Sequence, residues 1–285
     1  MGTLQLKDKK MKKKNSTSIY IHCFLILVSI TMLVPFVWMF LTSFKSITES
    51  TQVSPFVIFP SKWDPRAYTR VVAYINFALL YKNTFLMILF RIICAIITAS
   101  MAGYALGRLK FKGRNLVFGL VLTQMMVPSQ IFIIPQYVMI SKIGMTNTIF
   151  ALVYPGLVTA FGTFLMRQNY MTLPKDIEEA AKLDGLSIGK IFLLIMAPLT
   201  KSSMIALSIF TALFGYKDLM WPLIVNTRKE SLVLSSALAK MQGQYTTNYP
   251  ELMAASFISC IPMVVLYIIF QRKFIAGIAT TGGKL

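Results

Sequence analysis

The sequence predicts an all-helical membrane protein that crosses the bilayer six times. Of its 285 residues, 56% are hydrophobic and only 14% are charged. A hydrocarbon core about 30 Å thick takes roughly 20 helical residues to cross, and several apolar runs of this chain reach that length. We therefore interpret these runs as membrane spans rather than as helices of a globular core.

Six runs meet this length, and polar or charged stretches separate them. The predicted spans are residues 19–41, 83–106, 116–140, 148–166, 202–223 and 252–270. The first run is too long for the apolar region of a cleaved signal peptide, so we expect it to remain in the protein. The chain then has a basic N-terminus at residues 1–18, a transmembrane domain at residues 19–273 and a tail at residues 274–285.

The formal net charge of +19 reflects how the spans are oriented. With six spans, both termini lie on one side of the membrane. That side also holds the basic loop "RLKFKGR" and the loop of residues 167–201, and together these segments carry most of the Lys and Arg residues. The positive-inside rule then places both termini in the cytoplasm. We expect lipid, and not nucleic acid, to surround this multi-pass protein in the cytoplasmic membrane of a prokaryote.

The sequence offers little for catalysis or metal binding. The tail "GIATTGGKL" approaches the spacing of a phosphate-binding loop, but Gly283 stands where that loop requires Lys. His22 is the only histidine, and the three cysteines lie in apolar runs without ligand spacing. We expect this chain not to be an enzyme and to bind no cofactor of its own.

An acidic stretch between the fourth and fifth spans requires an explanation. Four of the ten acidic residues lie in "PKDIEEAAKLDG", which begins at Pro174. Proline suits a first helical turn, acids suit a helix N-terminus and Gly185 suits a helix end, so we predict a short helix at residues 175–184. We expect Lys182 to pair with Glu178 or Glu179 on its exposed face.

A second helix should complete a hairpin at residues 174–198. Ser187 is placed to cap this helix, and Pro198 marks a bend before the fifth span. We expect Ala180 and Ala181 to form a low surface on the other side of the first helix. The alternative is a solvated connecting loop whose charges keep it out of lipid.

The stretch "EAAKLDGLSIGKIFLLIMAP" resembles the EAA loop of permease subunits of ABC importers. The resemblance implies the type I importer fold, with this loop docking on a separate ATPase subunit. Ala197 departs from the Leu that usually precedes the motif's proline. The residues assigned to ATPase coupling by this resemblance are Glu179, Ala180, Ala181, Asp184, Gly185, Ile195 and Pro198.

Further stretches from residue 83 to the C-terminus are similar to maltose-type sugar permeases, specifically the smaller permease chain. They include "AGYALGRLKFKGRN", "IIPQYVMISKIGMTNT" and "FGTFLMRQNYMTLP". The resemblance implies half of a sugar importer. Its partners would be a second, different permease chain, two ATPase subunits that bind ATP and Mg, and an extracytoplasmic sugar-binding protein.

Polar residues inside the predicted spans are candidates for the transport pathway. An ionisable group at this depth should face protein or a water-filled cavity. Tyr216 and Lys217 stand where the family commonly has Trp and Asn. The candidates are Arg91, Gln124, Gln130, Tyr216, Lys217 and Asp218.

Two readings of these residues remain open. The cations Arg91 and Lys217 suggest a cargo that carries a carboxylate or sulfate. Alternatively, Arg91 pairs with a helix of the partner permease, and Lys217 pairs with Asp218 or lies at the outer interface. The glutamines suit either a pathway lining or hydrogen bonds between helices.

Two other classes compete with the importer. An ion-driven secondary carrier would need a buried carboxylate, for which Asp218 is the acidic candidate within a span. A membrane scaffold without transport fits the composition but leaves the acidic hairpin unexplained.

Overall fold

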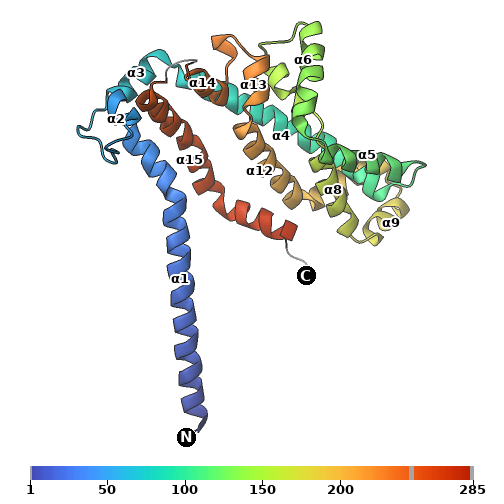
Figure 1. Ribbon diagram of the computed structural model, residues 1–285. Coiled ribbons are helices and arrows are strands. Elements are labelled where there is room, and N and C mark those ends of the chain that lie inside the picture. The colour runs from blue at the N-terminus through green and yellow to red at the C-terminus, as the bar shows by residue number, and fades with distance from the viewer. Residues whose placement is uncertain (1, 244–246, 283–285) are drawn as a thin grey trace. The chain divides into compact units, whose positions relative to one another are not determined.

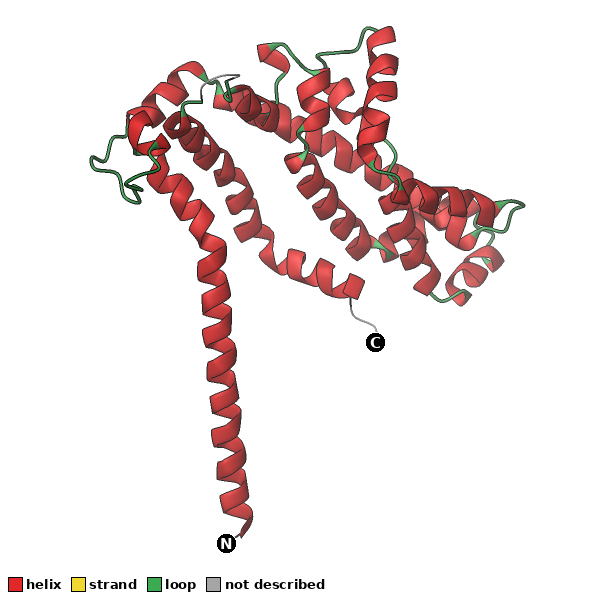
Figure 2. Cartoon of the chain, viewed as in Figure 1, coloured by secondary structure: helices red, strands yellow, loops and turns green. Residues whose placement is uncertain are grey.

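The computed structural model describes the backbone of residues 2–243 and 247–282, and the side chains of residues 18–243 and 247–271. The described residues form helices joined by loops, with no strand among them (Figure 2). The chain divides into two compact units, one of residues 1–75 with 242–260 and one of residues 76–241 with 261–285. We describe each by itself.

The first unit contains one long apolar helix and a polar connection. Helix α1 (Gly2–Thr42) includes the predicted first span, and its apolar part is Ser18–Thr42. Two short helices follow, α2 (Ile47–Thr51) and α3 (Arg66–Tyr74). The unit also contains the start of α15 (Tyr249–Gly282).

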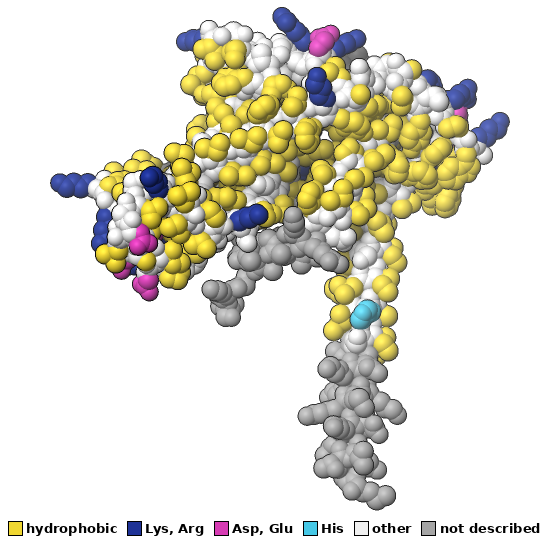
Figure 3. Space-filling view, turned by 180° about the vertical axis from the view of Figure 1, so that it is seen from behind, with side chains coloured by type: hydrophobic (Ala, Val, Ile, Leu, Met, Phe, Trp, Pro, Cys, Tyr) yellow, Lys and Arg dark blue, Asp and Glu magenta, His cyan; other side chains and the backbone are white. Residues whose placement is uncertain are grey.

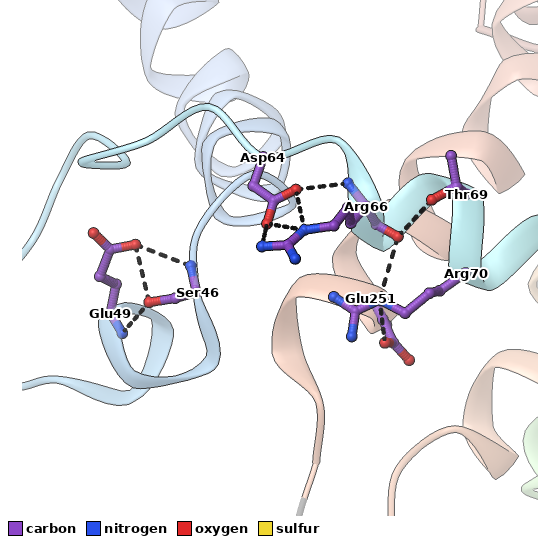
Figure 4. Close-up of polar contacts among 7 residues, drawn as sticks. All are labelled: Ser46, Glu49, Asp64, Arg66, Thr69, Arg70 and Glu251. Atoms are coloured by element: carbon purple, nitrogen blue, oxygen red, sulfur yellow. Dashed lines mark hydrogen bonds and ion pairs between the residues drawn. The ribbon is translucent and has the colours of Figure 1, made fainter.

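Polar contacts order this connection (Figure 4). Ser46 and Glu49 form a capping box at the start of α2, and Arg66, the first residue of α3, pairs with Asp64 at 2.6 Å. Glu251, at the start of α15, accepts a hydrogen bond from Tyr74 and pairs with Arg70, both on α3. Burial and the bond to Glu251 raise the pKa of Tyr74 to about 12. The segment between the first two predicted spans is therefore a folded element.

The second unit is built around α4 (Phe77–Arg108), which covers the predicted second span. Asn76 caps its first turn by accepting from the Leu79 N–H. Helix α4 packs against α8 (Ala160–Thr172) and α12 (Lys201–Lys217) (Figure 1). Gly103 permits the α4–α8 contact, because a Cβ there would lie 2.7 Å from the Arg167 backbone nitrogen.

The predicted third and fourth spans are each broken helices. In the third, α5 (Arg114–Met126) meets η1 (Ser129–Phe132) and α6 (Ile133–Lys142) at a bend of 99°. Pro128 explains the break, because it lacks an N–H and disfavours helix at Val127. The fourth consists of α7 (Ile149–Val153), η2 (Tyr154–Gly156) and α8, with a bend of 48°.

The predicted fifth span differs most from the structure. Helix α12 ends at Lys217, and the residues that follow form a separate short helix, α13 (Met220–Val225). The helices before α12 make a bent apolar pair with it, Ile188–Leu199 with Lys201–Lys217 at 74°. The chain continues through η4 (Lys229–Ser231) and α14 (Leu234–Lys240).

Three described helices are each long and apolar enough to cross a membrane. If each of the three bent helix pairs also counts as one span, the described residues contain up to six spans. Helix α15 covers the predicted sixth span through Gln271 and continues to Gly282, within the predicted tail. Among the described residues, hydrophobic side chains are widespread on the surface shown in Figure 3. Composition and fold together make this a multi-pass helical membrane protein.

Candidate functional site

The acidic stretch folds as the short helix α9 (Asp176–Leu183), close to the predicted bounds. Three acids lie in its first turn, where the helix dipole favours negative charge. Gly185 ends it with φ of 79°, a left-handed conformation that glycine adopts without strain. The N–H groups of Gly185 and Leu186 donate to the carbonyls of Lys182 and Ala181, so the helix end is well defined.

Helix α9 has a buried face and an exposed face. Glu178 and Ala181 are 8% and 4% exposed, whereas Leu183 is 89% exposed. The two alanines therefore do not share a surface, contrary to our expectation, because consecutive helical residues point about 100° apart. The exposed residues of the motif are Glu179, Ala180, Asp184 and Gly185.

The second arm of the hairpin joins the core of the unit. It consists of α10 (Ile188–Ile191), the π-helical turn η3 (Phe192–Met196) and α11 (Ala197–Leu199). Ile191 and Met196 are fully buried, and Ile195 packs against the same cluster. Ser187 precedes α10 but makes no side-chain cap bond, so the predicted cap is absent.

Pro198 lies directly after the π-helical turn and is exposed. Because proline has no N–H, the helix cannot keep its regular bonding there. The Ala197 N–H donates five residues back to the Phe192 carbonyl. The bend toward α12 follows at Thr200, close to where the sequence placed it.

The pairing predicted for Glu178 is wrong. Its carboxylate does not pair with Lys182 but accepts from Arg108 at 3.0 Å, in an ion pair whose side chains are 5% and 10% exposed. Arg108 is the last residue of α4, and sequence reasoning missed it. The spacing of Glu178 and Ala181 was the available signal, because residues three apart share a helix face and Ala181 is apolar.

Arg91 is used inside the chain. It is 7% exposed and donates to the Leu152 carbonyl, at 2.9 Å from Nε and 2.5 Å from Nη2. Its Nη1 lies 2.9 Å from an Asp218 carboxylate oxygen. Gly156 makes room for it, because a Cβ there would meet the Arg91 Cγ at 2.8 Å. Arg91 thus binds α4 to α7 and to the turn between α12 and α13.

The remaining pathway candidates differ in exposure and surroundings. Lys217 is exposed, and its ammonium lies 5.7 Å from the centre of the Phe214 ring. Gln124 and Gln130 are exposed on either side of the break between α5 and η1, and Tyr216 is partly buried. No group of three His, Cys, Asp or Glu side chains in the described part of the chain could hold a metal ion.

Comparisons with known proteins agree with this architecture. Residues 95–279 match the family described as binding-protein-dependent transport system inner membrane component. The arabinooligosaccharides transport system permease protein AraQ of Halalkalibacterium halodurans is 37% identical, over 68% of this chain and 69% of the relative. The diacetylchitobiose uptake system permease protein NgcG of Streptomyces coelicolor is 29% identical, over 92% of this chain and 87% of the relative.

A solved structure has the same fold. It is a crystal structure of a bacterial ABC transporter involved in the import of the acidic polysaccharide alginate. The matched chain has a TM-score of 0.75 and 22% sequence identity, over 90% of this chain and 96% of that chain. With its family match, its permease relatives and its apolar helices, the chain belongs to the inner membrane components of binding-protein-dependent ABC transport systems.

Proposed function

We propose that this chain is a permease subunit of an ATP-driven sugar importer and forms half of the translocation pathway. The names of the relatives support an oligosaccharide as cargo, since AraQ and NgcG belong to systems for arabinooligosaccharides and diacetylchitobiose. In this proposal a binding protein delivers the sugar on the outer side. A second, different permease chain supplies the other half of the pathway.

The exposed face of α9 is the observation that carries the coupling role. Leu183 is 89% exposed beside the charged side chains of Glu179 and Asp184, while the opposite face of the same helix is buried. A helix fixed from behind with an apolar residue in front suits a groove on another protein. We assign that groove to one of two ATPase subunits, which hold ATP and Mg, and the chain itself holds neither.

The buried face of the hairpin packs against the spanning helices, which supports the coupling role. Ala181, Ile191 and Met196 of the hairpin share a buried cluster with Ala99 of α4 and Leu207 of α12. A displacement of the hairpin by a partner therefore reaches the spanning helices through packed side chains. In this way closure of the ATPase pair changes which side of the membrane the pathway faces.

Of the two cations in the predicted pathway, Lys217 is the better candidate to bind an acidic group on the cargo. The guanidinium of Arg91 already has an acidic partner and a carbonyl partner within the chain. Lys217 is exposed, so it is the cation that we assign to an acidic group on the cargo. Lys217→Asn should lower uptake of an acidic oligosaccharide several-fold and leave a neutral one unchanged, and equal uptake of both would remove this assignment.

The ion-driven carrier is less well supported. Its coupling carboxylate would have to be Asp218, whose charge is balanced by Arg91 at 2.9 Å. A secondary carrier would need this carboxylate to exchange its coupling ion, and in this structure it is paired with a cation. The importer therefore remains the function that the site supports best.

The coupling proposal is tested by Glu179→Lys, with Glu230→Lys as matched control. Both acids are exposed and both changes reverse one charge, but Glu230 lies in η4, far along the chain from α9. Sugar uptake by the reconstituted complex should fall at least tenfold in Glu179→Lys, with loss of the copurified ATPase. Wild-type uptake in this variant would contradict the docking role of α9.

A further inference from the structure

The polar contact between α4 and α9 is made largely by Arg108, beside Tyr104, which also bonds to Glu178. The apolar packing of Ala181 adds to this contact. The Nε of Arg108 donates to Glu178 at 3.0 Å. Its two terminal nitrogens donate to backbone carbonyls where α8 ends and α9 begins, at 2.9 Å to Leu173, 3.1 Å to Pro174 and 3.4 Å to Tyr170. One guanidinium therefore holds the end of α8, the turn after it and the first turn of α9.

The planar shape of this group makes the contact rigid. A guanidinium presents five N–H donors in a fixed fork, so binding four acceptors at once fixes the position of each. A lysine ammonium has three donors and cannot reproduce that pattern. The Arg108 and Glu178 side chains are 5% and 10% exposed, so water cannot readily replace these bonds.

Aromatic side chains surround the ion pair. Tyr104 lies one turn before Arg108 and packs edge-on against Tyr170, with ring centres 5.5 Å apart. It also packs against Phe192 of the π-helical turn at 5.2 Å. The phenol of Tyr170 is bonded to Ser100 of α4 at 2.6 Å. The end of α4 is thus fixed to both arms of the hairpin, and the ion pair and Tyr104 both link it to α9.

We propose that Arg108 is the positioning residue through which movement of α9 is transmitted to α4. The inference rests on the coupling role proposed above for α9. A partner that moves the exposed face of α9 moves Glu178 on the opposite face, and Arg108 pulls the end of α4 with it. Without the Arg108 guanidinium, α9 still docks, but less of its movement is transmitted to α4.

The test compares Arg108→Lys and Glu178→Gln with Arg167→Lys in the complete complex in proteoliposomes. Arg167 is the matched control, because it also donates to an α4 carbonyl, that of Leu106 at 3.2 Å, and makes no described contact with α9. Sugar transport and ATP hydrolysis are measured on the same samples. We expect transport per ATP hydrolysed to fall at least tenfold in Arg108→Lys and at least threefold in Glu178→Gln, with little change in Arg167→Lys.

A distance measurement separates positioning from general loss of structure. Spin labels at Met101→Cys on α4 and Lys182→Cys on α9, after replacement of the native cysteines, report the α4–α9 distance. In Arg108→Lys this distribution should broaden while the complex stays assembled. If the complex with Arg108→Lys does not assemble, the inference is tested with Glu178→Gln by the same two measurements, the ratio of transport to ATP hydrolysis and the α4–α9 distance distribution.

Two results would overturn the inference. One is an unchanged ratio of transport to hydrolysis in Arg108→Lys and Glu178→Gln, and the other is an equal loss in Arg167→Lys. The proposed function fails separately, by normal uptake in Glu179→Lys or by absence of an ATPase from the wild-type complex.

Discussion

Arg91 shows how this chain accommodates a charge inside an apolar helix. Removing a guanidinium from water is costly unless its donors are bonded and its charge is paired. Arg91 meets both needs within the chain, through Leu152 and Asp218. The sequence identified Arg91 as a residue in need of a partner, but it could not show which of several acceptors lay nearby.

A double-mutant cycle tests this pair. Arg91→Gln leaves Asp218 without its cation, and Asp218→Asn does the reverse. Breaking a fully buried pair costs about 3–5 kcal/mol. Because the Asp218 side chain is 23% exposed, we expect about 2 kcal/mol from thermal unfolding in detergent. The double variant should lose less than the sum of the single losses, and additive losses would contradict the pairing.

Glu49 gives a pH-dependent prediction outside the spans. Hydrogen bonds from Ser61 and from Ser46 lower the pKa of Glu49 from 4.5 to about 2. A carboxyl whose pKa is lowered on folding stabilises the fold fully above its unfolded pKa. This contribution is lost as the pH falls from about 4.5 toward 2.

Hydrogen exchange measures this local effect. Ser46 and Ser61 donate their N–H groups to different oxygens of Glu49, at 2.9 and 3.1 Å. In Glu49→Gln an NH2 group replaces one carboxylate oxygen and the negative charge is lost. One of the two N–H groups therefore loses its acceptor and the other keeps a weaker bond, so protection should fall at pH 7. The wild type should lose this protection progressively as the pH falls from about 4.5 toward 2, and equal protection in both proteins at pH 7 would refute the prediction.

At the scale of the elements, the close approach of α4 and α8 depends on glycine. A Cβ at Gly103 would meet the Arg167 nitrogen and the Met166 Cβ, each at 2.7 Å. Gly103→Ala should therefore destabilise the protein by about 1–3 kcal/mol, the usual cost of overpacking. Thermal unfolding in one detergent measures this loss.

Gly119→Ala is the matched control. Gly119 lies inside α5, and a Cβ there would meet nothing within 4 Å. Alanine suits a helix interior better than glycine by about 0.5–1 kcal/mol, so this variant should be neutral or stabilised. Equal losses in both variants would show that the α4–α8 contact is not the cause.

The elements also show what the sequence can and cannot predict. The apolar stretches of α1, α4 and α15 follow from composition, because length and hydropathy are local properties. The breaks at Val127 and Thr200 depend on neighbours that satisfy the freed backbone groups. The prolines in the sequence therefore indicate that the helices bend, but not by what angle. The sequence offered Lys182 as a partner for Glu178 or Glu179, because local spacing cannot reveal Arg108, which lies 70 residues before Glu178.

At the scale of the whole molecule, the orientation in the membrane is open to direct measurement. We expect α9 in the cytoplasm and η4 on the outer side, from the positive-inside rule. In a chain without its native cysteines, an impermeant maleimide should label Asp184→Cys only in inside-out vesicles. It should label Lys229→Cys only from outside, and labelling of both from one side would contradict six spans.

The ion pair of Arg108 with Glu178 also has a consequence for biogenesis. The ribosome makes Arg108 well before Glu178, since 70 residues separate them. Helix α4 is therefore synthesised before the carboxylate that will neutralise its last residue exists. We expect that during that interval Arg108 is a cation at a helix end that water and lipid phosphates can satisfy, and that it favours the cytoplasmic side as the positive-inside rule describes. On this view the same side chain contributes first to orientation during synthesis and later to the folded structure as a bond.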